Sequence, residues 1–61
     1  MELVPVYRFE HFDEQHDAWV VHEHFATREL IARLGGRRVP KSEALVHPSR
    51  LQGGGFVALV P

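Results

Sequence analysis

Residues 18–36 read AWVVHEHFATRELIARLGG, and the spacing of the apolar residues changes in the middle of this stretch. Residues 18–25 alternate at period two, which predicts a strand. One face of this strand carries Trp19, Val21, Glu23 and Phe25. This face holds the larger apolar side chains, so we expect it to form the core, with the histidines on the polar side and Glu23 near the rim.

Residues 26–36 predict a short α-helix. Thr27 is a good N-cap, because its side-chain oxygen can accept a hydrogen bond from a free amide of the first turn. Leu30, Ile31 and Leu34 form one apolar stripe, and Gly35 supplies the left-handed residue that ends a helix. So short a helix is unstable alone in water, so we expect it to dock on a sheet.

The residues around this stretch predict further strands. Alternating residues indicate a strand over Val4–Phe12, with Leu3, Pro5, Tyr7 and Phe9 on one face. The polar residues 13–17 predict a hairpin connection. A third strand is expected over Ser42–His47, with Leu45 directed inward, and residues 52–55 read as a flexible joint. Residues 56–60 are apolar without interruption and predict a last strand.

The predicted fold class is α+β: a small antiparallel sheet of order β-β-α-β, with a possible fourth strand and the helix packed on one face. Residues 1–61 are expected to form a single small domain. A chain of this size buries only about 60% of its unfolded surface, so it usually needs additional stabilisation. Cysteine is absent from the sequence, which leaves metal binding, self-association or good packing.

Composition excludes some classes of protein and favours others. With 44% hydrophobic and 25% charged residues the chain is typical of a globular domain. No apolar run approaches the length of a membrane span. The first residues have neither the basic nor the apolar region of a signal peptide, so a cytoplasmic protein is expected. The size and layout resemble those of many small bacterial or phage-encoded proteins, a likeness that carries no functional residues.

The charges are divided along the chain. Residues 1–25 carry six acidic side chains and one basic one, whereas residues 26–61 carry six basic and two acidic ones. Such asymmetry indicates a charged partner. The predicted partner-binding or nucleic-acid-binding residues are Arg28, Arg33, Arg37, Arg38 and Lys41. Arginine near the end of a helix also complements the helix dipole, which is the alternative explanation.

Three histidines are candidate metal ligands. His22 and His24 project from the same strand face about 7 Å apart, and His11 lies on the neighbouring strand. The alternative is a solvated strand face on which histidine is tolerated. No cofactor is implied by any motif.

Catalytic motifs are poorly represented. Ser42 and Ser49 lack the surroundings of a nucleophile elbow. The glycines at 53–55 are not followed by Gly-Lys-Ser/Thr, so they do not form a phosphate-binding loop. The sequence therefore predicts a protein that works by binding and not by catalysis.

The apolar C-terminus predicts self-association. Its candidate residues are Phe56, Val57 and Leu59, which could pair with a second chain. The alternative is an ordinary last strand of a monomer. The function expected first is a protein-interaction or regulatory module that forms a homodimer or binds another protein. A nucleic-acid-binding accessory protein is the second hypothesis, and a histidine-based metal binder is the third.

Overall fold

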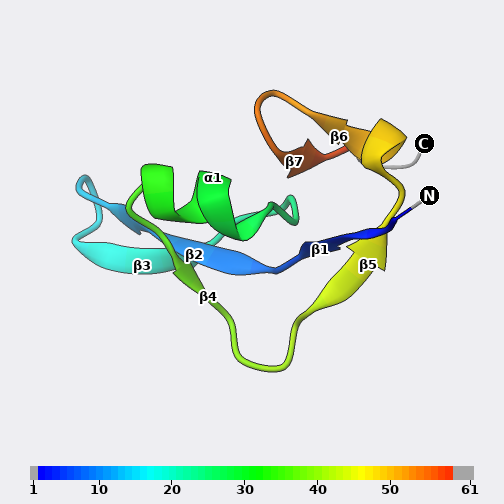
Figure 1. Cartoon of the computed structure of the whole chain (residues 1–61). Helices are drawn as coiled ribbons and strands as arrows, with labels where there is room; N and C mark the ends of the chain where they lie inside the picture. The colour runs from blue at the N-terminus through cyan, green and yellow to red at the C-terminus, as the bar shows by residue number, and fades with distance from the viewer. Residues whose placement is uncertain (1, 59–61) are drawn as a thin grey trace.

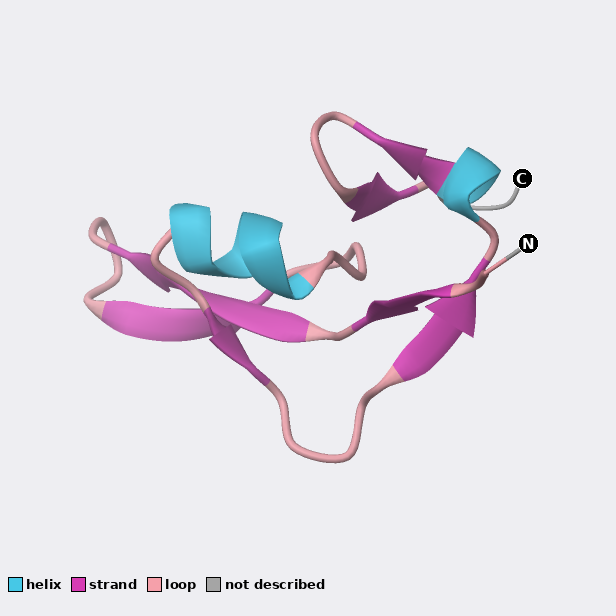
Figure 2. Cartoon of the chain, viewed as in Figure 1, coloured by secondary structure: helices cyan, strands magenta, loops and turns pink. Residues whose placement is uncertain are grey.

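The computed structural model describes residues 2–58, which form an α+β fold of one short helix and three small antiparallel sheets (Figures 1 and 2). The first sheet pairs β1 (Val4–Val6) with β5 (Ala44–Val46), the second has the order β3 (Ala18–Val21), β2 (Phe9–Asp13), β4 (Arg37–Arg38), and the third pairs β6 (Leu51–Gln52) with β7 (Phe56–Val57). The helix is α1 (Arg28–Arg33), and a 3₁₀ turn, η1, spans Pro48–Arg50. The predicted class is confirmed, but several sheets replace the expected single one.

The N-terminal strand is broken at Tyr7 and Arg8, and this break changes which residues are buried. Tyr7 leaves the first sheet and forms a bridge with Ala26, through N–H···O hydrogen bonds of 2.9 and 3.0 Å. Val6 and Phe9 are both fully buried although they are three residues apart. The prediction that Pro5, Tyr7 and Phe9 share one face of a single strand is therefore wrong, because the chain bends between two sheets.

The second predicted strand ends at Val21, and the face predicted to be buried is exposed to solvent. β3 covers only four residues, and all four are exposed. Trp19 is 39% exposed and Val21 is 47% exposed, so the prediction that this face forms the core is wrong. The reason is the position of α1, which lies over the face of the sheet that carries Phe9 (Figure 1).

The helix begins and ends as the sequence predicts. Thr27 is the N-cap, and its Oγ1 accepts a hydrogen bond from the Leu30 amide at 3.3 Å. Gly35 follows the helix with a φ of +71°. Leu30 and Ile31 are buried and form the core with Phe9. Leu34 is half exposed instead, because it is the C-cap and lies past the last turn that contacts the sheet.

Two expectations for the second half of the chain are corrected. Leu45 is 59% exposed and does not point inward, because β5 pairs with β1 at the far end of the molecule from α1. The glycine run is not a flexible joint but the turn of the β6–β7 hairpin, with φ values of +60°, +84° and +140° at Gly53, Gly54 and Gly55. Glycine adopts positive φ values more readily than any other residue, and a φ of +140° is accessible almost to glycine alone.

The β6–β7 hairpin closes the core above α1. The Thr27 amide donates to the Gly55 carbonyl at 3.0 Å, and the Val57 amide donates to the Phe25 carbonyl at 2.8 Å. Val57 is buried, and Phe56 packs against the core around Phe9. Residues 56–57 are thus covered by their own chain. Residues 59–61, including the candidate Leu59, lie outside the described residues.

Candidate functional site

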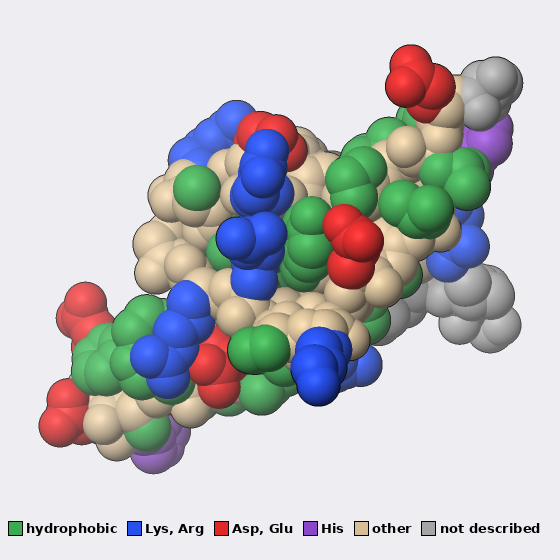
Figure 3. All heavy atoms as spheres, turned by 60° about the horizontal axis from the view of Figure 1, so that its bottom comes forward, with side chains coloured by type: hydrophobic (Ala, Val, Ile, Leu, Met, Phe, Trp, Pro, Cys, Tyr) green, Lys and Arg blue, Asp and Glu red, His purple; other side chains and the backbone are tan. Residues whose placement is uncertain are grey.

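The face of the β2–β3 hairpin that points away from α1 carries an apolar patch. The register pairs Phe12 with Trp19 and Glu10 with Val21 on this face. The rings of Phe12 and Trp19 meet edge to face, with centroids 5.6 Å apart. We call Phe12, Trp19 and Val21 the hairpin patch. In Figure 3, hydrophobic side chains gather at this end of the molecule, next to basic and acidic ones.

A charged pair borders the hairpin patch and holds Trp19 in place. β4 places Arg37 opposite Glu10, and Arg37 Nε donates to Glu10 Oε1 at 2.7 Å. The Arg37 guanidinium also lies over the Trp19 ring, 4.1 Å from its centroid. Such stacking is favourable because the face of an indole ring is electron-rich. Phe12 is 44% exposed, so the patch remains open to solvent despite this arrangement.

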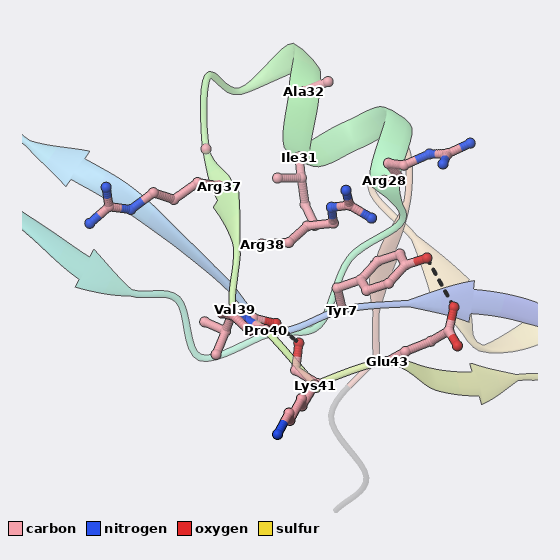
Figure 4. A pocket seen from close by; sticks show the side chains of 12 residues that line it. Tyr7, Arg28, Ile31, Ala32, Arg37, Arg38, Val39, Pro40, Lys41 and Glu43 are labelled. Carbon is pink, nitrogen blue, oxygen red and sulfur yellow. Dashed lines mark hydrogen bonds between the residues drawn. The ribbon is translucent and has the colours of Figure 1, made fainter.

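A second candidate site is a cavity of about 600 Å³ between α1, β4 and the β4–β5 loop (Figure 4). Its apolar walls come from Ile31, Ala32 and the Tyr7 ring. The basic residues that border it are Arg28, Arg37, Arg38 and Lys41. Four of the five basic residues predicted from the sequence therefore lie around one cavity. Arg33 is the exception, because it lies on the side of the helix that faces Gly54.

The side chains around this basic cavity differ in direction. Arg38 lies between Ile31 and Tyr7, with its guanidinium 5.0 Å from the Tyr7 ring centroid (Figure 4). Arg37 points out of the cavity, toward Trp19 and Glu10. Tyr7 donates a hydrogen bond from its hydroxyl to Glu43 at 3.0 Å. The cavity thus combines an apolar interior with a mostly cationic border, which suits an anionic group attached to a flat or apolar one.

The three candidate histidines lie on the α1 side of the sheet. The ring centroids of His11 and His22 are 5.5 Å apart, and those of His22 and His24 are 5.6 Å apart. His22 is stacked between Phe9, at 4.8 Å, and Phe56, at 5.2 Å. The prediction that His22 lies on the polar side of a strand is therefore wrong. No local sequence signal indicates this stack, since its rings come from three distant segments.

Two of these rings already have hydrogen-bond partners. The His24 amide donates to His22 Nδ1 at 3.0 Å. His24 Nδ1 lies 3.0 Å from the Val57 carbonyl, which can only accept, so this nitrogen carries the proton. Within residues 2–58 no group of three or more His, Cys, Asp or Glu side chains is arranged to hold a metal ion. Metal binding by His11, His22 and His24 stays a prediction.

The tip of the β2–β3 hairpin is organised by Asp13. Its carboxylate accepts from the Gln15 amide at 3.0 Å and from His16 Nδ1 at 2.7 Å. The His16 side chain is the main cause that holds the pKa of Asp13 below its ordinary value of 3.8. Asp17 ends the turn with a φ of +51°, a conformation that Asp tolerates better than most residues. The turn keeps β2 and β3 in the register that forms the hairpin patch.

Within residues 2–58 no helix has the length and apolar character required to cross a membrane. Comparisons of the chain with protein-family models, with curated proteins and with solved structures find no match. The geometry of the hairpin patch and of the basic cavity is therefore the basis on which a function can be proposed.

Proposed function

We propose that the chain is a small non-enzymatic interaction module that self-associates, and that its contact surface is the hairpin patch. The observation that carries this proposal is the exposure of Phe12, Trp19 and Val21 on one face of one hairpin. Exposed apolar side chains that are grouped together favour a contact site, whereas scattered ones do not. Aromatic residues contribute most to such contacts.

The proposed contact surface differs from the C-terminal strand, through which the sequence predicts self-association. Phe56 and Val57 are already packed against Phe9, His22 and the backbone of Phe25. Using them to bind a second chain would require the core to open. The hairpin patch requires no such rearrangement, so contact there leaves the fold intact. Because the patch consists of few side chains, we expect the association to be weak and strongly dependent on concentration.

The test compares Val21→Lys with Leu45→Lys by sedimentation velocity over a range of protein concentrations. Both substitutions place a lysine at an exposed apolar position of a strand, but only Val21 belongs to the hairpin patch. We expect the wild type and Leu45→Lys to associate equally and Val21→Lys to remain monomeric. Equal association of both variants would refute the role of the patch. Circular dichroism checks that both variants are folded.

A second candidate function is the binding of a phosphate-bearing polymer at the basic cavity. The observation that favours it is that Arg28, Arg38 and Lys41 border one cavity, where Glu43 is the opposing acidic residue. Each phosphate neutralised by a basic side chain releases counterions, so affinity falls as salt increases. Three contacts would give a slope of about −2 to −3 in a plot of log K against log salt.

The matched variants for this second candidate are Arg38→Gln and Arg33→Gln. Each removes one positive charge, but Arg38 lies in the cavity and Arg33 does not. With a single-stranded oligonucleotide as ligand, we expect Arg38→Gln to weaken binding and to reduce the salt slope by about one. Arg33→Gln should change neither. Equal effects of the two variants would indicate a diffuse charge effect and rule out a site at the cavity.

A further inference from the structure

We propose that the partner of the hairpin is a second copy of this chain, paired antiparallel along β3 about a two-fold axis at Val20. This inference rests on the proposed self-association and specifies its geometry. In this register Trp19 of each copy lies opposite Val21 of the other, and the two Val20 residues face each other. The sheet then continues through both copies, in the order β4, β2, β3 and then β3, β2, β4 of the second copy.

The hydrogen bonds of β3 define which of its backbone groups are free to pair. Residues of an antiparallel pair alternate between hydrogen-bonded and non-hydrogen-bonded positions. The His22 amide donates to the Phe9 carbonyl at 2.8 Å, so Val20, two residues earlier, also directs its backbone groups toward β2. Trp19 and Val21 therefore direct their N–H and C=O groups away from β2. Those four groups complement the same four groups of an antiparallel copy.

β3 is the strand edge with the least protection against such pairing. Edge strands are commonly protected by charged side chains, by proline or by short length. β4 consists of two arginines, β1 contains Pro5, and β6 and β7 have two residues each. β5 is one residue shorter than β3 and ends two residues before Pro48. β3 has four uncharged residues and forms the free edge of its sheet.

Side chains and charges favour a second copy as the occupant of this edge. In the proposed register Trp19 and Val21 of both copies form one continuous apolar strip on the open face. The acidic turn at residues 14–17 of each copy approaches residues 23–26 of the other. The Arg8 guanidinium lies at that end, 5.0 Å from the Phe25 ring centroid, so it faces the partner's acidic turn. Glu23 is the acidic residue at that end and partly offsets this attraction.

The absence of cysteine from the chain allows a direct test by single-cysteine cross-linking. In the proposed dimer the two Val20 residues form a non-hydrogen-bonded pair with a Cα–Cα distance of about 4.5 Å, which a disulfide can span. The variants are Val20→Cys, Val21→Cys and, as a control on β5, Leu45→Cys. Each folded variant is oxidised with diamide at a concentration at which the wild type associates, and covalent dimer is measured by non-reducing electrophoresis.

We expect Val20→Cys to become mostly covalent dimer and Leu45→Cys to remain monomeric. Preferential cross-linking of Val21→Cys would contradict the register, because it would place the axis one residue away. If Val20→Cys fails to cross-link while wild-type association is still abolished by Val21→Lys, edge pairing is wrong and contact at the hairpin patch stands. A wild type that is monomeric at every concentration would overturn both proposals.

Discussion

Thr27 connects the helix to the C-terminal hairpin. Its Oγ1 accepts from the Leu30 amide, and its own amide donates to the Gly55 carbonyl. We expect Thr27→Ala to lower the free energy of unfolding by about 1 kcal/mol, because the Leu30 amide loses its partner in a buried position. Thr27→Ser keeps the hydroxyl and should lose less. Denaturant midpoints measure both effects, and equal midpoints for the wild type and Thr27→Ala would show that the cap contributes nothing.

Asp13 gives the hairpin turn a defined pH dependence. Its pKa is lowered in the folded protein, mainly by His16, so its stabilising effect is complete above the ordinary value of 3.8 and is lost as pH falls through the lower folded pKa. We expect Asp13→Asn to be less stable than the wild type at pH 5, with the difference vanishing once the pH falls below the lowered pKa of Asp13. Asp17→Asn is the control, because asparagine tolerates a φ of +51°. A difference that persists in acid would contradict the role of the carboxylate.

At the scale of residues, local signals were sufficient for some features only. Thr27 and Gly35 were predictable because a helix cap and a helix end are determined by neighbouring residues. The stacking of His22 between Phe9 and Phe56 was not predictable. It depends on a bend after Val21 and on a hairpin more than thirty residues later. Neither feature produces a recognisable sequence pattern around His22.

The β6–β7 hairpin depends on Gly55 more than on its other glycines. A Cβ at Gly55 would lie 2.6 Å from Thr27 Oγ1 and 3.1 Å from Leu30 Cβ, and its φ is +140°. At Gly54 the nearest atom would be 4.0 Å away, although φ is also positive. The turn is therefore fitted to the start of α1 at Gly55.

We expect Gly55→Ala to destabilise the fold by about 2–4 kcal/mol, from backbone strain and overpacking together. Gly54→Ala should cost only about 1–2 kcal/mol, from the backbone strain alone. Thermal or denaturant unfolding of the two variants measures the difference. If Gly54→Ala is as destabilising as Gly55→Ala, then the contact of the turn with Thr27 is not what positions the hairpin.

The identity of the elements was easier to predict than their pairing. The helix and the β2–β3 hairpin are contiguous in sequence, and both are predicted from it, although the first predicted strand breaks at Tyr7 and the second ends at Val21 instead of Phe25. The partners of β1 and β7 come from distant parts of the chain, so no local pattern specifies them. Composition alone does not distinguish a linker from a turn that packs against a helix, so the glycine run predicts a flexible joint although it forms a turn.

The whole molecule is elongated, with extents of 41 × 23 × 20 Å, and its single α-helix in residues 2–58 covers one face of the central sheet (Figure 1). Which face it covers was not predictable, because both faces of the hairpin carry large apolar side chains. The clustering of the basic residues, in contrast, was predictable from the sequence. Four of the five predicted basic residues border one cavity, since residues 28–41 are close in sequence and turn around it.

In the proposed assembly β7 belongs to the fold of one chain, and β3 is the strand that meets a second chain. Amide hydrogen exchange measured by NMR at low and high protein concentration tests both parts at once. We predict that the Val57 amide, bonded to Phe25, is protected at every concentration, and that the Trp19 and Val21 amides become protected only at high concentration. Protection of Val57 that rises with concentration, with Trp19 and Val21 unchanged, would contradict the account.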